Sequence, residues 1–198
     1  MSMRWFAGLL ALGVALPQMA TAEPIRIVAF GTSATYGRYL ERGQDYPSKL
    51  EAALKAKGYD VRVKNAGKIG DFAVNALGRI YSAVPNGTHI AIVEFGVNEI
   101  KLKHQDPASI RAAIGKLVDR VRPRASQVLL VDYMQLDLTS VARAHGAEPI
   151  PWSGLGNRPD PRYVVPNDPL NHLNPAGYDI VVARMLPIVE AAVRQLPR

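Results

Sequence analysis

Ser33 is the strongest candidate in this sequence for a catalytic nucleophile. It stands in the stretch IVAFGTSATYG, where an apolar run ends at Gly31 and hydroxyl side chains follow. A serine in a strand-to-helix turn projects its hydroxyl above the sheet, and its own N–H lies at a helix N-terminus, where negative charge is favoured. The same position also suits a serine that only caps a helix, which is a common use of this residue.

His172 is the histidine best placed to activate that hydroxyl. It comes two residues before Asn174-Pro175, a pair that predicts a helix start because asparagine caps helices and proline is favoured at the first helical position. A serine hydroxyl is a poor nucleophile until an imidazole removes its proton. The imidazole in turn needs an acceptor to orient it, normally a carboxylate, and Asp168 is the candidate.

Gly70 and Asn98 add the remaining chemistry. Each follows an apolar run of its own, Gly70 in the turn NAGKIGD and Asn98 in the turn GVNE. Taken singly, both are ordinary turn residues. Together with Ser33, they supply three donors for the oxyanion of a tetrahedral intermediate: the N–H groups of Ser33 and Gly70, and the side-chain amide of Asn98. The set therefore fits acyl transfer.

The elements that must position these residues alternate along the chain. Apolar, β-branched runs predict strands, and apolar residues at helical spacing predict helices between them, which is the rhythm of βαβ units in a parallel sheet covered on both faces. The predicted strands are 25–30, 61–63, 89–95 and 128–131, and the predicted helices are 46–57, 72–81, 109–122, one near 138 and one near the C-terminus. Ligands of such sheets bind beyond the carboxyl ends of the strands, where Ser33, Gly70 and Asn98 lie.

A proline-rich stretch separates the last predicted strand from the last helix. Seven of the fifteen prolines fall between Pro149 and Pro175, which predicts a long ordered loop of the kind that often carries function. Trp152 and Tyr163 lie in this stretch, and we expect them to form an apolar wall of the substrate site.

Residues 1–22 predict a secretory signal peptide. Arg4 precedes an apolar run, and Ala20-Thr21-Ala22 forms a small-residue cleavage site before Glu23. The run is shorter than the roughly 20 residues that cross a bilayer. We therefore expect a single domain over 23–198, exported to the periplasm or the medium, with no stable membrane anchor.

Composition narrows the classes of function further. The chain has no cysteine, which excludes thiol catalysis and cysteine-bound metals, and no histidine pair has the spacing of a metal site. We expect no cofactor. Without Arg4, 23 basic and 17 acidic residues leave a net charge of +6. These basic residues are scattered, so they favour a solvated surface over a nucleic-acid partner. No oligomeric state follows from the sequence.

In order and position, the four segments around Ser33, Gly70, Asn98 and His172 resemble the four signature blocks of the SGNH (GDSL-type) hydrolases. The closest likeness is to the small exported arylesterase, thioesterase and lysophospholipase branch, which needs no metal. The resemblance implies a three-layer α/β/α sandwich with a mostly parallel, flavodoxin-like sheet. It also implies that Ser33 is the nucleophile and His172 the base, with Gly70 and Asn98 completing the oxyanion hole.

Three positions depart from the family pattern. Thr32 stands where an aspartate is usual, and Glu99 stands where aspartate commonly follows the asparagine. Pro169 occupies the place of the triad aspartate, three residues before His172, while Asp168 lies four before it. We expect either that the loop bulges so that Asp168 still reaches the imidazole, or that a backbone carbonyl orients it, and we favour Asp168.

The leading hypothesis is an exported serine ester hydrolase acting on short-chain acyl or aryl esters. Lysophospholipids, acyl thioesters and acetylated sugars stay open as substrates, because one fold and one catalytic set serve all of these activities. Two alternatives make no use of an activated serine. One is a flavin- or phosphate-binding module, and the other is a non-catalytic relative that binds a glycan, lipid or phosphate-bearing ligand.

Overall fold

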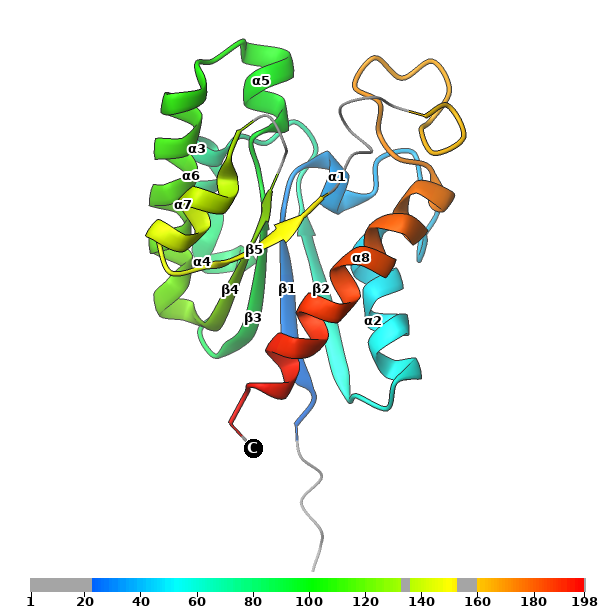
Figure 1. Cartoon of the computed structure of the whole chain (residues 1–198), viewed down its shortest axis with the longest axis vertical. Coiled ribbons are helices and arrows are strands. Elements are labelled where there is room, and N and C mark those ends of the chain that lie inside the picture. The colour runs from blue at the N-terminus through cyan, green and yellow to red at the C-terminus, as the bar shows by residue number, and fades with distance from the viewer. Residues whose placement is uncertain (1–22, 133–135, 153–159, 198) are drawn as a thin grey trace, which may run out of the picture.

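Five parallel strands form the centre of the computed structural model, which describes residues 23–132, 136–152 and 160–197 (Figure 1). The predicted signal peptide, 1–22, lies outside the described residues. The strand order is β2-β1-β3-β4-β5, with every neighbouring pair parallel. This is the order of flavodoxin-like sheets. The strands are β1 (Ile25–Gly31), β2 (Val61–Gly67), β3 (Thr88–Glu94), β4 (Ala125–Asp132) and β5 (Glu148–Pro151).

Helices cover both faces of the sheet. Successive side chains of a strand point to opposite sides, so each strand contributes apolar side chains to both faces. Val28 and Phe30 of β1 pack into one core, and Ile27 and Ala29 into the other. In Figure 1, the helices of the two faces stand on either side of the sheet. The first face carries α3 (Ala73–Ala76), α6 (Pro107–Val121) and α7 (Leu138–Ala144), and the second carries α2 (Tyr46–Ala56) and α8 (Pro175–Arg194). The predicted three-layer α/β/α sandwich is confirmed.

Two segments differ most from the sequence-based expectation. The segment expected as a turn after β3 begins a helix, α5 (Val97–Lys103), and α5 carries Asn98 in its first turn. The proline-rich stretch, expected to be a loop throughout, begins with the edge strand β5, which contains Pro149 and Pro151. Proline lacks an N–H and is tolerated only where a strand has a free edge, which explains why this short strand looked like a loop. That part of the prediction is wrong.

Two smaller differences remain. The strand predicted at 61–63 continues to Gly67, so the first residues of the expected turn NAGKIGD belong to β2. The other difference concerns the helix predicted at 72–81. It is split into α3, a 3₁₀ turn (Leu77–Arg79) and α4 (Ile80–Ala83). Within the ranges described, no helix combines the length and apolar character needed to cross a bilayer.

The carboxyl end of the sheet is where the site must lie. From β1 the chain goes outward to β2, and β3 then pairs with the other side of β1, so the strand order reverses next to β1. The short helix α1 (Ser33–Tyr36) follows β1, and α5 follows β3 at that same end. Crevices at such a reversal point are the usual ligand sites of open parallel sheets.

Candidate active site

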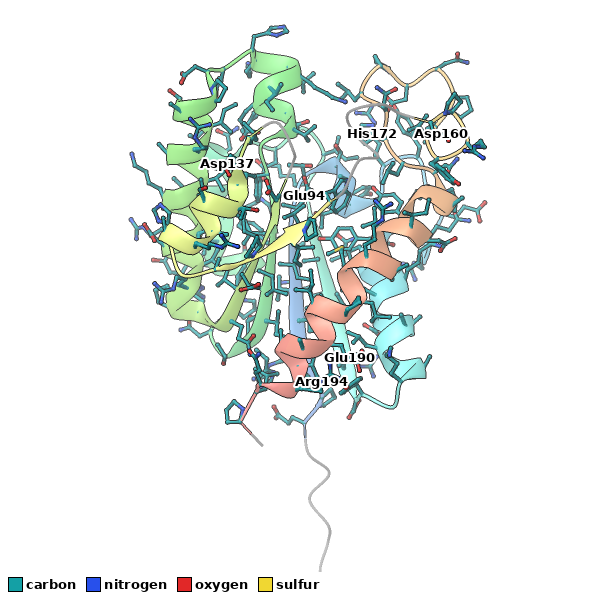
Figure 2. All side chains as sticks on the ribbon, viewed as in Figure 1. Glu94, Asp137, Asp160, His172, Glu190 and Arg194 are labelled. Carbon is teal, nitrogen blue, oxygen red and sulfur yellow. The ribbon has the colours of Figure 1, made fainter. Side chains whose placement is uncertain are left out.

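A hydrogen-bonded chain runs from a carboxylate through an imidazole to a hydroxyl at this end of the sheet. His172 Nε2 lies 2.7 Å from Ser33 Oγ, and His172 Nδ1 lies 2.7 Å from Asp168 Oδ2. Ser33 is 3% exposed and His172 is 7% exposed. Figure 2 shows His172 beyond the carboxyl end of the sheet, on the segment that leads into α8. The structure thus brings together the three residues that the sequence singled out as nucleophile, base and orienting acid.

The loop before α8 explains how an aspartate four residues away reaches the imidazole. Asn171 N–H donates to the Asp168 carbonyl at 3.0 Å, closing a four-residue turn in which Pro169 takes the second position, where proline is favoured. Asn171 then adopts a positive φ of 55°, which asparagine tolerates better than most residues. This brings His172 back toward the turn, and its backbone N–H donates to Asp168 Oδ2 at 2.6 Å.

A strand-like pair holds the two ends of this loop together. Val165 N–H donates to the His172 carbonyl at 2.8 Å, and Val164 forms an antiparallel bridge with Leu173. Asn174 caps α8 through its side chain, which accepts from Gly177 N–H at 3.0 Å. The base is therefore fixed both by a loop closed on itself and by the start of the last helix.

The charge state of Asp168 follows from its surroundings. Burial opposes ionisation, but the hydrogen bonds from the backbone and ring of His172, together with attraction to that ring, outweigh it, so the pKa of Asp168 lies below its usual value. Lys101 of α5 donates to the Leu170 carbonyl at 2.7 Å, inside the same loop. Burial lowers the pKa of the Lys101 ammonium, and attraction to Asp168 opposes that shift. Lys101 thus ties the helix of Asn98 to the loop of His172.

Glu94 holds the turn that displays the nucleophile. This carboxylate, at the end of β3, is fully buried. Its Oε2 accepts from Thr32 N–H at 3.0 Å, the Thr32 hydroxyl at 3.0 Å, Thr35 N–H at 3.2 Å and the Thr35 hydroxyl at 2.8 Å. Gly31 makes room for this contact, since a Cβ there would lie 2.7 Å from Glu94 Oε2. Ser33 is thus clamped between two threonines bound to one carboxylate.

Arg79 joins the turn of Ser33 to the turn of Gly70. Its guanidinium donates to the Gly31 carbonyl at 2.9 Å, to the Ala66 carbonyl at 2.8 Å and to Asp71 Oδ2 at 2.7 Å. Lys68 N–H also donates to the Gly31 carbonyl, at 3.0 Å. Hydrogen bonds therefore join the loops after β1 and β2, which suits donors that must converge on one oxygen.

Gly70 occupies the third position of a tight turn. Asp71 N–H bonds to the Lys68 carbonyl at 3.3 Å, and Gly70 has a φ of +71°, which glycine adopts at little cost. Asn98 reaches this turn directly, because its Nδ2 donates to the Asp71 carbonyl at 2.8 Å. An amide nitrogen carries two protons, so the second is available to a ligand. The predicted oxyanion residues Gly70 and Asn98 thus belong to adjoining segments.

Glu99 has a structural place beside them. Its Oε1 accepts from Ala73 N–H at 2.6 Å, and its Oε2 accepts from Gly96 N–H at 3.1 Å. These bonds satisfy backbone donors at the N-termini of α3 and α5, as a carboxylate in a first turn often does.

Trp152 and Tyr163 were both expected to line the substrate site. The structure contradicts the expectation for Trp152, which is 6% exposed and packs in the core, with ring centroids 5.6 Å from Tyr46 and 6.5 Å from Tyr178. An indole buried in this way cannot form an open wall. Tyr163 is half-buried beneath the guanidinium of Arg162, and its part in the site stays a prediction.

No metal centre is apparent in the ranges described: they hold no group of three His, Asp or Glu side chains placed to bind a metal ion. The described site contains a hydroxyl, an imidazole and a carboxylate in hydrogen-bond contact.

Sequence reasoning missed four residues of this region. The sequence gives a weak indication for Glu94 and Arg79, because each is a charged residue adjacent to apolar residues that pack in the core. It gives none for Lys101, because its partner is a backbone carbonyl 69 residues away. It gives none either for Tyr39, whose ring meets that of His172.

Comparison with known proteins supplies relatives for this geometry, although no family model matches the chain. Esterase TesA from Pseudomonas aeruginosa is 28% identical over 148 residues, spanning 71% of this chain and 72% of that protein. The crystal structure of AlinE4, described as an SGNH-hydrolase family esterase, is 27% identical with a TM-score of 0.66, over 90% of this chain and 100% of that one. A crystal structure of TesA superposes with a TM-score of 0.73 at 20% identity, over 84% of this chain and 99% of that one, and supports the fold alone.

Proposed function

Because this chain resembles the SGNH (GDSL-type) hydrolases over nine-tenths of its length, we propose that it is a serine ester hydrolase that works through an acyl-enzyme. One observation carries the proposal: the unbroken contact from Asp168 through His172 to Ser33, made by three side chains with little access to water. A serine that only capped a helix would have no need of a buried imidazole at its hydroxyl.

The first half of the reaction forms the acyl-enzyme. Ser33 Oγ attacks the ester carbonyl carbon while His172 Nε2 takes the hydroxyl proton, and Asp168 stabilises the imidazolium that results. The carbonyl oxygen becomes an oxyanion, facing the N–H groups of Ser33 and Gly70 and the amide of Asn98. The C–O bond to the alcohol then breaks, and His172 gives its proton to the leaving oxygen.

The second half repeats these steps with water. His172 removes a proton from a water molecule, which attacks the acyl carbon, and the same donors stabilise the second oxyanion. Collapse of this intermediate returns the proton to Ser33 Oγ and releases the carboxylic acid. Ser33 and His172 act as a unit, so the losses from removing each should not add.

The test is covalent labelling by a fluorophosphonate probe, combined with hydrolysis of 4-nitrophenyl acetate and butyrate. We expect the folded protein to be labelled, Ser33→Ala to abolish labelling and turnover, and His172→Ala to slow both by at least about a thousandfold. A folded protein that resists labelling, or a Ser33→Ala variant that keeps near-normal turnover, would overturn the proposal. Resistance to labelling would favour a binding module.

The substrate class we propose is short-chain acyl or aryl esters. The turns after β1 and β2 that hold Ser33 and Gly70 are short, and Ile69, beside Gly70, is 44% exposed, which favours a shallow, open site. Acyl chains of two to twelve carbons on one alcohol provide the test. Activity that peaks at the short chains supports the proposal, and activity that rises steadily with length contradicts it.

Export is the last part of the proposal. Residues 1–22 have the charge, apolar run and small-residue cleavage site of a signal peptide. Expression of the full chain in a bacterial host should yield periplasmic protein that begins at Glu23. Protein that keeps Met1 and stays in the cytoplasm would refute this part alone.

A further inference from the structure

Tyr39 lies beside the imidazole of the candidate base. The rings of Tyr39 and His172 have centroids 5.7 Å apart, with planes inclined at 78°. Tyr39 is 56% exposed, whereas Ser33 and His172 are almost fully buried, so its ring borders the site on the solvent side. It is also close in sequence to the nucleophile, since Gly37 N–H and Arg38 N–H both donate to the Ser33 carbonyl at 3.1 Å.

The backbone at Tyr39 does not favour a tyrosine. Leu40 N–H donates to the Gly37 carbonyl at 3.1 Å, which closes a four-residue turn with Tyr39 third, and Tyr39 has a φ of +69°. Glycine or asparagine is preferred at such a position, and a bulky side chain there is an outlier. Backbone strain of this kind is concentrated at active sites and ligand-binding sites.

Arg38 supports the ring from one side. Its guanidinium carbon lies 4.6 Å from the centroid of the Tyr39 ring, a cation–π contact. With Arg38 over one face and His172 nearby, the exposed remainder of the ring forms an aromatic surface next to the imidazole. A flat apolar group that stacked on this surface would lie beside the imidazole ring of His172.

The chemistry of the site identifies which part of the substrate that group is. The acyl carbonyl oxygen must face the oxyanion donors of Ser33, Gly70 and Asn98. The alcohol oxygen must instead face His172 Nε2, because the imidazole hands its proton to that oxygen as the alcohol departs. The surface beside His172 therefore meets the alcohol portion of the ester.

We propose that Tyr39, supported by Arg38, forms the leaving-group subsite and favours esters of aromatic alcohols over esters of alkyl alcohols. This inference rests on the proposed function. It predicts that Tyr39 contributes to acylation, when the alcohol is present, and contributes nothing to deacylation, when the alcohol has left. A purely structural role would affect both steps.

The test compares two acetates that form the same acetyl-enzyme. Phenyl acetate and ethyl acetate differ only in the alcohol, and kcat/KM reports acylation for each. Deacylation is measured separately: the enzyme is mixed with 4-nitrophenyl acetate, and the decay of the acetyl-enzyme is followed by intact-mass spectrometry. Tyr39→Asn is the main variant, because asparagine tolerates the positive φ and keeps the turn foldable. Tyr39→Phe keeps the ring.

We expect Tyr39→Asn to lower kcat/KM for phenyl acetate about tenfold, the scale of one aromatic contact with its buried area, and for ethyl acetate less than twofold. The lifetime of the acetyl-enzyme should not change, and Tyr39→Phe should stay within twofold of wild type. Tyr81→Asn is the matched control, since Tyr81 is 72% exposed and has Arg124 over its ring at 4.7 Å, but lies on α4, which leads into the opposite end of the sheet.

Three results would overturn the inference. These are equal losses on the two acetates, a lengthened acetyl-enzyme lifetime in Tyr39→Asn, and no loss on phenyl acetate. Failure of the proposed function looks different, because wild-type protein would then form no acetyl-enzyme that depends on Ser33, and the inference would fall with it.

Discussion

Replacing Asp168 by asparagine is the sharpest perturbation of this site, because it removes a charge and keeps the shape. Oδ2 accepts both from the backbone N–H of His172, at 2.6 Å, and from its ring nitrogen, at 2.7 Å. Asparagine offers one acceptor oxygen to these two donors, and its own NH2 adds a third donor where the side chain is only 3% exposed.

The size of the effect follows from these contacts. Without a carboxylate, the imidazolium loses its counter-charge, and the amide stabilises the wrong ring tautomer, a change that lowers kcat by roughly 10³- to 10⁴-fold in a serine triad. That range corresponds to about 4–5.5 kcal/mol in activation free energy. Asp168 does not face the substrate, so KM should change little. One buried donor left unsatisfied also lowers the free energy of unfolding by about 1–3 kcal/mol.

The assay is steady-state hydrolysis of 4-nitrophenyl butyrate at neutral pH, with thermal unfolding to confirm that each variant is folded. Asp160→Asn is the matched control, because Asp160 lies in the same region (Figure 2) and pairs with the exposed Arg162 at 2.5 Å. We expect this variant to keep full activity. If Asp168→Asn and Asp168→Ala both keep kcat within tenfold of wild type, another group orients His172 and the assignment of Asp168 is wrong.

Three further predictions follow from neighbouring contacts. Asn98→Ala should lower kcat about 10²- to 10³-fold, because it removes one oxyanion donor, and steady-state kinetics would contradict this if KM alone changed. Lys101→Met should lower kcat roughly tenfold by freeing the Leu170 carbonyl from α5, whereas Lys103→Met, an equal loss of charge on the same helix, should have no effect. The pKa of Asp168 is lower in the folded protein than the value of about 3.8 expected for the unfolded chain. The ionised carboxylate therefore stabilises the folded protein above pH 3.8, and this stabilisation is lost as the pH falls through the lower pKa of the folded state. Urea unfolding at pH 7 and pH 2 should therefore show a smaller stability advantage of wild type over Asp168→Asn at the lower pH.

Much of the fold could be predicted from the sequence because buried parallel strands appear as unbroken apolar runs. The strands β1, β3 and β4 follow this rule, and their alternation with helical patterns leaves few other topologies. Strand β5 escaped notice because it has four residues, two of them proline. Helix α5 escaped because Gly96, which precedes it, resembled the centre of a turn.

The candidate site was predictable in its residues but not in its supports. Ser33, Gly70 and Asn98 follow three successive strands, β1, β2 and β3, and the parallel sheet brings those positions to one end. His172 reaches the same end through the loop that leads into α8. The support of Ser33 by Glu94 could not be predicted, because a contact across 62 residues depends on the register between β1 and β3. Local patterns contain no information about that register.

Two of the three departures from the family pattern have the same physical explanation. Thr32 replaces an aspartate at a point where the fully buried Glu94 already supplies the carboxylate, and a second carboxylate there would face the first without water to screen it. Pro169 replaces the aspartate nearer to His172, and the turn it favours, followed by Asn171 at positive φ, brings Asp168 to the same imidazole nitrogen. At both positions a carboxylate from elsewhere in the sequence is present: Glu94 bonds to Thr32, and Asp168 bonds to His172. Spacing in a motif is therefore a weaker constraint than the hydrogen bond that the motif exists to make.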